Sequence, residues 1–347
     1  MPAADLIAGI AARQIPALAR AVSLVENGRP GYEELLSALH PRVGRAHRIG
    51  VTGPPGAGKS TITERLIHTY RASGMSVGVV AVDPTSPFTG GALLGDRIRM
   101  ESGALDADVY IRSMATRGEL GGLATSTREV CDVLDAFGFE RLIIETVGVG
   151  QSELTIAATA DTAVLVLVPE SGDGVQVLKA GVMEIADIYA INKADRPGAD
   201  RLCNEIEVML GIRRGNAFRH VAPHHRPEAA RPIAQPAGSV AAADWEPPAL
   251  TLSALRGEGM AELVEAIERH AAFLRASGEL ERRRRDRLAR HTREVVDRSL
   301  RHLVWEEGSG EAALRAGLAA GDERVNPYEL AHRILADVRR ELHDGRP

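Results

Sequence analysis

The sequence predicts a three-layer α/β domain with a mostly parallel sheet, flanked by N- and C-terminal helical extensions. Aliphatic runs alternate with amphipathic stretches between residue 46 and about residue 272. The runs are nearly continuous rather than interleaved with polar residues, as expected for parallel strands covered on both faces. A glycine-rich loop joins the first run to a helical pattern, and both ends of the chain lack strand-like runs.

The chain of 347 residues is therefore expected to divide into three parts. Residues 1–45 carry apolar residues at helical spacings, interrupted by turn residues, and are expected to form an N-terminal helical extension. Residues 46–272 are expected to form the α/β domain. Residues 273–347 contain two long charged helical stretches separated by Gly308-Ser309-Gly310, which predict a C-terminal helical region.

Composition narrows the functional classes. The net charge of −5 is mild and indicates neither a nucleic-acid partner nor a polybasic membrane anchor. The apolar stretch at 160–168 is too short for a membrane span and is better interpreted as a buried strand. Asp5 and two arginines interrupt the N-terminal apolar residues, unlike a secretory signal. Cys131 and Cys203 stand alone in the sequence, as in a reduced protein, so we expect a cytoplasmic location.

The most informative motif is GPPGAGKS at 53–60, which fits the pattern GxxxxGK[ST] between a predicted strand at 48–52 and a predicted helix at 61–71. Glycines let backbone N–H groups wrap phosphate oxygens, and the helix N-terminus adds partial positive charge. We expect Lys59 to reach the terminal phosphates and Ser60 to place its hydroxyl on Mg²⁺. A bare glycine-rich turn is the alternative. The predicted nucleoside-triphosphate site comprises Gly53, Pro54, Pro55, Gly56, Ala57, Gly58, Lys59, Ser60 and Thr61.

The sequence NKAD at 192–195 follows the apolar run at 187–191 and matches NKxD, the guanine-reading motif of GTPases. The Asp195 carboxylate can accept from guanine N1 and its exocyclic amine, whereas adenine has an acceptor at N1. Leaving Asp195 unpaired would cost a few kcal/mol (about 1–3), enough to discriminate between bases. Lys193 can lie over the base, and Asn192 can hold neighbouring backbone and the N7 edge. An ordinary polar turn is the alternative. The segment LTLSAL at 250–255 resembles the strand and Ser-Ala segment that closes over guanine in GTPases, which adds Ser253, Ala254 and Leu255.

Acidic residues at the ends of aliphatic runs predict a magnesium site. Glu145 precedes Gly148 by three positions, like the motif DxxG with Glu in place of Asp. Such an acid holds Mg²⁺ through water, and the glycine amide can report the γ-phosphate. Asp83 ends another aliphatic run, where open α/β sheets bind their ligands. Asp96 follows within GDRIRM. The alternatives are a turn residue for Asp83 and a helix N-cap for Asp96.

A set of segments resembles, in this order, the methylmalonyl-CoA mutase-associated GTPases of the MeaB or MMAA type, also called ArgK-like and labelled historically as arginine/ornithine transport kinases. The segments are GPPGAGKST, VDPTSP, GDRIRM, ETVGVGQSE, GDGVQVLKAG, NKAD and TLSALRGEG. The resemblance covers nearly the whole chain, and ETVGVGQSE and GDGVQ are far more specific than a phosphate loop. It implies a GTPase that converts GTP and water to GDP and phosphate, and that acts as a metallochaperone gating cobalamin loading and protection of a cobalamin-dependent acyl-CoA mutase.

The resemblance also implies roles for particular residues. It makes Lys59, Asp83, Asp96 and Glu145 the catalytic phosphate and magnesium residues, beside the Ser60 ligand already expected from the phosphate loop. It implies that C-terminal helices form a homodimer, and that residues 171–179 couple nucleotide state to the mutase. The expected coupling residues are Gln151, Asp173, Gln176 and Lys179. Gln151 is also a candidate for orienting the attacking water, but its offset from Gly148 differs from the usual GTPase pattern.

Other interpretations stay open at this point. A metal-insertion GTPase of the nickel type needs a Cys/His delivery motif, and none is visible. A small-molecule transport-system kinase is disfavoured by NKAD. The histidines near residue 220 lie in a Pro- and Ala-rich segment, so 213–243 is interpreted as a long irregular loop rather than a metal site. The charge run at 281–287 indicates a solvated helix face or an interaction surface. An apolar stripe in this region indicates packing, including packing on a second copy: Leu274, Leu280, Leu288, Val295, Val296, Leu300 and Leu303.

Overall fold

The computed structural model describes residues 3–83, 106–115, 120–146, 156, 159–169, 186–213, 245–319 and 326–343. The chain forms two compact units, Met1–Arg283 and Arg284–Pro347. No helix in these described ranges is long and apolar enough to cross a membrane.

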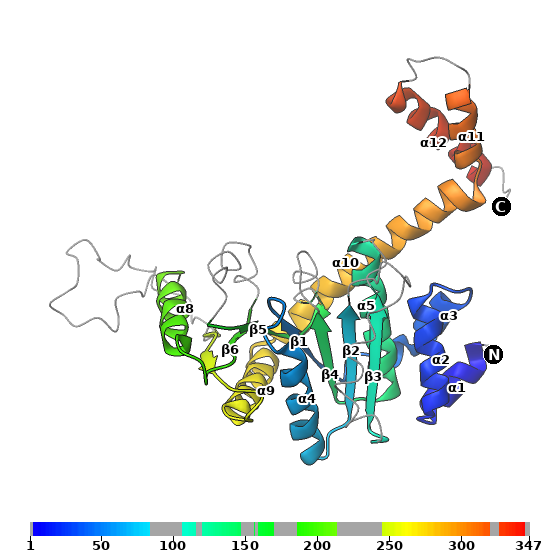
Figure 1. Cartoon of the computed structure of the whole chain (residues 1–347). Coiled ribbons are helices and arrows are strands. Elements are labelled where there is room, and N and C mark those ends of the chain that lie inside the picture. Colours follow the sequence, from blue (N-terminus) through cyan, green and yellow to red (C-terminus); the bar gives the residue numbers. More distant parts are fainter. Residues whose placement is uncertain are drawn as a thin grey trace, which may run out of the picture. The chain divides into compact units, whose positions relative to one another are not determined.

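Within the described residues, the first unit contains a seven-stranded sheet in the order β3-β2-β4-β1-β5-β6-β7 (Figure 1). Every neighbouring pair of strands runs parallel, which confirms the predicted fold class. The strands are β1 (His47–Thr52), β2 (Val77–Asp83), β3 (Val109–Ala115), β4 (Arg141–Thr146), β5 (Thr162–Leu167), β6 (Ile188–Ile191) and β7 (Ala249–Thr251). Strand β3 was not predicted, because VYIRSMA mixes polar with apolar residues.

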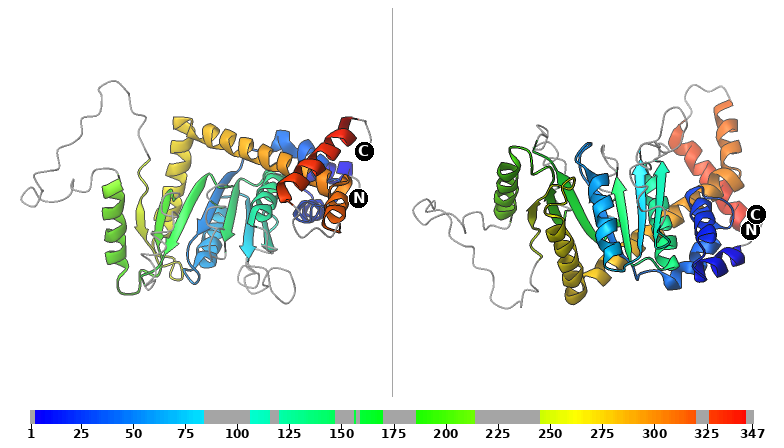
Figure 2. Two further views of the ribbon diagram at one scale, coloured as in Figure 1. Left: turned by 90° about the horizontal axis from the view of Figure 1, so that it is seen from above. Right: turned by 60° about the horizontal axis from the view of Figure 1, so that its bottom comes forward.

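Helices cover both faces of this sheet (Figure 2). In β2, Val77 and Val79 pack into the cluster that includes α4 (Lys59–Ala72) and α9 (Met260–Ser277). Val80 and Val82 pack into the opposite cluster, with α5 (Leu120–Phe137). Helix α8 (Ala199–Arg213) covers β5 and β6 through Ile206 and Leu210. Because alternate strand residues are buried on opposite faces, the strands contain continuous aliphatic runs.

The N-terminal helices are α1 (Ala3–Ala11), α2 (Ile15–Glu26) and α3 (Tyr32–Leu39), followed by a short 3₁₀ turn (His40–Arg42). Leu6, Leu18 and Leu35 lie in the same apolar cluster as Val80 of β2 and Leu134 of α5. The N-terminal helices therefore share one hydrophobic core with the sheet.

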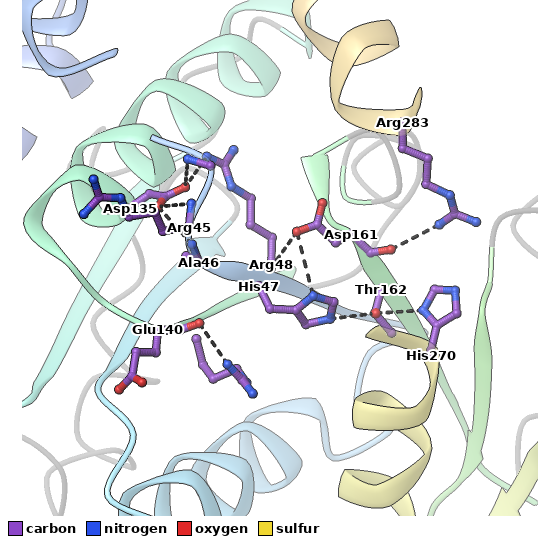
Figure 3. Close-up of polar contacts among 12 residues, drawn as sticks. Arg45, Ala46, His47, Arg48, Asp135, Glu140, Asp161, Thr162, His270 and Arg283 are labelled. Atoms are coloured by element: carbon purple, nitrogen blue, oxygen red, sulfur yellow. Dashed lines mark hydrogen bonds and ion pairs between the residues drawn. The ribbon is translucent and has the colours of Figure 1, made fainter. Parts of the chain in front are cut away.

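A buried carboxylate fixes the junction between these helices and β1 (Figure 3). Asp135 of α5 accepts hydrogen bonds from three successive backbone N–H groups, those of Gly44, Arg45 and Ala46, at 2.8, 3.1 and 3.0 Å. The Arg48 guanidinium lies 3.4 Å from the same carboxylate. A buried carboxylate is tolerated only when hydrogen bonds or cations compensate its charge. The contacts of Asp135 therefore fix the backbone at residues 44–46, just before β1.

The described residues of the second unit are helical apart from short connections. Helix α10 (Glu279–His302) begins in the first unit and continues into a π-helical turn, Leu303–Glu307. The second predicted helical stretch is in fact two helices, α11 (Gly310–Ala319) and α12 (Pro327–His343). A Cβ on Gly310 would lie 2.3 Å from the Val304 carbonyl oxygen, so the small residue permits this close turn.

The residues of the predicted apolar stripe have different environments. Leu274 and Leu280 are buried within the first unit. Leu303 packs beside Leu330, Ile334 and Val338 of α12. The exposed members are Leu288, Val296 and Leu300 of α10.

Candidate nucleotide-binding site

The predicted site residues that the structure describes gather at the carboxyl edge of the sheet. The phosphate loop follows β1, Glu145 lies near the end of β4, and Asn192 follows β6. Strands β4 and β5 flank β1 on opposite sides, so the chain changes side of β1 between them. In open α/β sheets, such a switch point produces the crevice in which ligands bind.

The phosphate loop needs its glycines for distinct reasons. Gly53 has φ 142°, and a Cβ there would lie 2.1 Å from the Val166 carbonyl oxygen of β5. Gly58 has φ 90° and precedes the first residue of α4; its Cβ would lie 2.3 Å from Asn192 Nδ2. Gly56 has φ 72° with open space around it, so only its backbone conformation favours glycine. The loop is thus packed closely against β5 and the residue after β6.

Lys59 is nearly buried and folds back over the loop that precedes it. Its Nζ donates to the carbonyl oxygens of Gly53 and Pro54, at 2.8 and 2.9 Å. These two hydrogen bonds hold the ammonium at the mouth of the loop, next to the N-terminus of α4. A cation and a helix N-terminus at one place favour a bound anion.

The side-chain oxygens of Ser60 and Glu145 face one another beside this loop. Ser60 Oγ donates to Glu145 Oε1 at 2.6 Å. Strand β2 ends at Asp83, one position beyond the Val82–Thr146 pair, so the backbone of Asp83 lies at the same edge. The Thr52 and Thr146 hydroxyls are 3.2 Å apart and link the root of the loop to the strand that carries Glu145.

Asn192 joins the separate parts of the site. Its buried side-chain amide donates from Nδ2 to the Ala57 carbonyl oxygen at 2.8 Å and accepts at Oδ1 from the Ala254 backbone N–H at 3.0 Å. The expectation that Asn192 holds neighbouring backbone is therefore met. One side chain connects the phosphate loop, the NKAD motif and the segment after β7.

Asp195 is positioned by Ser253, whose Oγ donates to Asp195 Oδ1 at 2.9 Å. This hydrogen bond lowers the pKa of Asp195 below its ordinary value of 3.8, and nearby Arg256 adds to the effect. Lys193 has φ 60°, a left-handed conformation that costs a non-glycine residue about 1–2 kcal/mol. Backbone strain of this kind concentrates at functional sites. The hydrogen bond from Ser253 therefore favours the ionised form of the Asp195 carboxylate and orients it.

Several predicted residues lie outside the described part of the chain. They are Asp96, Gly148, Gln151, Asp173, Gln176 and Lys179, together with all of the predicted irregular loop 213–243 except Arg213. The Asp83 side chain is likewise outside it. The structure thus places the phosphate loop and Glu145 close to the NKAD motif and to the segment at 253–255.

Sequence reasoning missed Arg65, a residue of α4 whose guanidinium donates to the carbonyl oxygens of Ala254 and Leu255, both at 3.0 Å. No local motif signals this role, because the partners are 189 and 190 residues away. Only the fold brings α4 beside the turn after β7.

A buried polar network at the opposite edge of the sheet was also missed (Figure 3). Thr162 Oγ1 lies 2.9 Å from His47 Nε2 and 2.8 Å from His270 Nδ1. His270 Nε2 lies 3.3 Å from Asp187, the residue before β6. Arg283 also binds Asp187, at 3.2 Å, so this member of the charge run is an anchor rather than part of a solvated face. The network supports the fold, at the end of the strands away from the phosphate loop.

Each histidine of this network presents one ring nitrogen to the Thr162 hydroxyl and the other to a carboxylate. His270 Nε2 lies 3.3 Å from Asp187, and His47 Nδ1 lies 3.9 Å from Asp161. Both rings are neutral in this arrangement, and burial lowers the pKa of each from 6.5 to about 4.

Comparison with known proteins agrees with this geometry. A family model described as methylmalonyl Co-A mutase-associated GTPase MeaB matches residues 18–309. A Pyrococcus abyssi protein is 42% identical over 328 residues, 93% of this chain and 92% of its own length. The Escherichia coli GTPase ArgK is 34% identical over 335 residues, 94% of each chain. The crystal structure of LAO/AO transport system kinase is 26% identical with a TM-score of 0.63, covering 97% of each chain. The chain therefore belongs to the MeaB family of GTPases.

Proposed function

We propose that this GTPase is a chaperone of a cobalamin-dependent acyl-CoA mutase of the methylmalonyl-CoA mutase type. In this proposal its GTP state gates cobalamin loading and protects the mutase. The observation that carries the proposal is the match, over residues 18–309, to a family named for association with that mutase. The assembled phosphate and base motifs support a nucleotide-dependent role.

We assign GTP to the carboxyl edge of the sheet, with its phosphates in the loop at 53–60. Hydrolysis transfers the γ-phosphoryl group to water without a covalent protein intermediate. The Lys59 ammonium and the loop amides stabilise the charge on the phosphate oxygens, and Gly148 is assigned to the γ-phosphate. Lys59 is already held at the loop by the Gly53 and Pro54 carbonyls, so little reorganisation is needed. Thr61, the last residue of the predicted nucleoside-triphosphate site, lies in the first turn of α4.

The ligand set beside the loop fits Mg²⁺. Hydroxyl and carboxylate oxygens are the hard ligands this ion prefers, and it usually keeps several waters. Ser60 Oγ and Glu145 Oε1 are already within 2.6 Å of each other, and Asp83 ends the neighbouring strand. We assign Ser60 as a direct ligand and Glu145, Asp83 and Asp96 as acids that hold the ion or its waters. The bound ion would neutralise phosphate charge.

On the base side, we assign Asp195 to guanine N1–H and the exocyclic amine. Ser253 orients the Asp195 carboxylate by donating to Oδ1, and the second oxygen, Oδ2, takes no part in this hydrogen bond. Lys193 would lie over the base, and Ala254 and Leu255 would close the pocket. A site with an oriented acceptor rejects bases that lack the matching donors.

We also propose a homodimer through α10. Its exposed Leu288, Val296 and Leu300 are about half accessible (51, 50 and 53%), and a second copy covering them would remove apolar surface from water. Of the seven residues in the predicted apolar stripe, we therefore assign only these three to the dimer interface.

The experiment that tests the chaperone proposal is GTP turnover with and without a methylmalonyl-CoA-type mutase, alongside transfer of cobalamin to the apo-mutase. We expect the mutase to accelerate hydrolysis and GTP to control transfer.

Lys59→Ala should abolish turnover, with and without the mutase, because it removes a cation from the phosphate site. Lys179→Ala should keep the intrinsic rate but reduce mutase-stimulated hydrolysis at least several-fold, since Lys179 lies in the proposed coupling segment. Unchanged turnover and transfer in the presence of mutase would refute the chaperone role. Equal stimulation of wild type and Lys179→Ala would refute only the role of Lys179.

A further inference from the structure

Arg65 connects α4, the helix that follows the phosphate loop, to the turn at residues 253–258 after β7, called the base-side turn below. Its Nε donates to the Ala254 carbonyl oxygen and its Nη2 to the Leu255 carbonyl oxygen, both at 3.0 Å. The planar guanidinium is suited to such a two-pronged contact, because its N–H groups are fixed in one plane. Two successive carbonyls are thereby turned toward α4.

These contacts close a ring of hydrogen bonds through the site. Ala57 of the phosphate loop accepts from Asn192, and Asn192 accepts from the Ala254 N–H. Ala254 then accepts from Arg65, which lies on the helix that leaves the phosphate loop. The position of the base-side turn is therefore set from two directions, by Asn192 and by Arg65.

The turn itself is compact and carries the residue that orients Asp195. The Arg256 N–H donates to the Ser253 carbonyl at 3.0 Å, and Ser253 and Glu258 exchange backbone hydrogen bonds at 3.0 and 3.2 Å. Gly257 has φ 78°, and a Cβ there would lie 4.0 Å from Arg65 Cζ. The guanidinium is thus beside the turn whose Ser253 hydroxyl holds Asp195.

Stability alone accounts poorly for Arg65. The residue is exposed; its contact with Leu255 is in solvent and its contact with Ala254 is partly buried, so the net contribution of these hydrogen bonds to folding is modest. The same contacts can still orient the turn. Two hydrogen-bonded carbonyls reduce the number of conformations available to it, even where it is exposed to solvent.

We propose that Arg65 is a positioning residue for guanine recognition. It acts through the base-side turn, by holding Ser253 and hence Asp195 in the geometry that accepts two donors of the base. The inference rests on the proposed GTP site and adds the residue that makes base selectivity depend on the phosphate-loop helix.

The experiment measures Kd for GDP, inosine diphosphate, ADP and inorganic tripolyphosphate in wild type, Arg65→Gln and Arg65→Lys. Inosine lacks the exocyclic amine, so the ratio of its Kd to that of GDP reports two-donor recognition by Asp195. In Arg65→Gln we expect this ratio to fall about tenfold, the size of one charged hydrogen bond, with tripolyphosphate affinity unchanged. Arg65→Lys keeps one donor and should give an intermediate ratio. The GTP KM should rise in Arg65→Gln while kcat at saturation is retained.

The matched control is Arg71→Gln. Arg71 lies on the same helix and binds Asp106 through two hydrogen bonds, but away from the base-side turn. It should lower the unfolding midpoint without changing the ratio. An Arg65→Gln protein with a wild-type ratio would overturn the inference, as would equal losses for tripolyphosphate and GDP. A wild-type protein that does not prefer GDP over ADP would instead overturn the GTP-site assignment.

Discussion

Acidification should destabilise the first compact unit by charging two buried histidines. Burial lowers the pKa of both His47 and His270 from 6.5 to about 4. Asp161 and Asp187 favour the charged rings, whereas Arg141 and Arg283 oppose them, and burial outweighs these charges. Glu268 also faces His47 and favours its charged form.

The magnitude follows from the difference between folded and unfolded pKa values. The folded pKa is the lower one, so the unfolded chain binds protons first. The stabilisation is therefore complete above pH 6.5 and is lost as pH falls toward 4. Each pKa unit corresponds to about 1.4 kcal/mol, so each histidine should remove about 2 kcal/mol by pH 5. The two together remove about 4 kcal/mol, a large part of a typical domain stability of about 5–15 kcal/mol.

The assay is urea unfolding at pH values from 7.5 to 5, a window above the ordinary range of Asp and Glu. His47→Gln keeps a polar side chain near Thr162 but cannot be charged, so it should remove about half of the pH dependence. The control is His302→Gln, because His302 is half exposed in the second unit and pairs with Glu306. A pH dependence as steep in His47→Gln as in wild type would refute the reasoning.

Three further outcomes are expected. The chain has only three lysines, at positions 59, 179 and 193, so amine-selective labelling reports on the motifs directly. Lys59 should react more slowly than Lys193 in the folded protein, because two carbonyls hold its ammonium; equal rates by mass spectrometry would contradict the loop geometry. Asp195→Asn exchanges an acceptor for a donor and should shift preference from GTP toward xanthosine triphosphate, and an unchanged Kd ratio would count against the assignment. Replacing both Leu288 and Val296 by Arg should give monomers by light scattering; a monomeric wild type at micromolar concentration would exclude the dimer.

The sequence predicted those parts of the fold and site that are encoded locally. The strand, loop and helix around Lys59 and the apolar run before Asn192 are contiguous, so their patterns are visible without the fold. Arg65 was not predictable in this way, because its role exists only where α4 meets a turn 189 residues later. The His47–Thr162–His270 network likewise depends on strand order, and a lone histidine on a strand gives no sign of it.

The Asp135 contacts have a consequence for how the molecule opens. Separating the N-terminal helices from the sheet would break three backbone hydrogen bonds to one carboxylate and bare an apolar face of α5. We therefore expect this opening to be costly, with the helices and the central strands unfolding as one cooperative unit. Amide hydrogens of α2 should then exchange as slowly as those of β1, and limited proteolysis should not release residues 1–45 from the folded protein. Faster exchange in α2 would mean that the helices open independently.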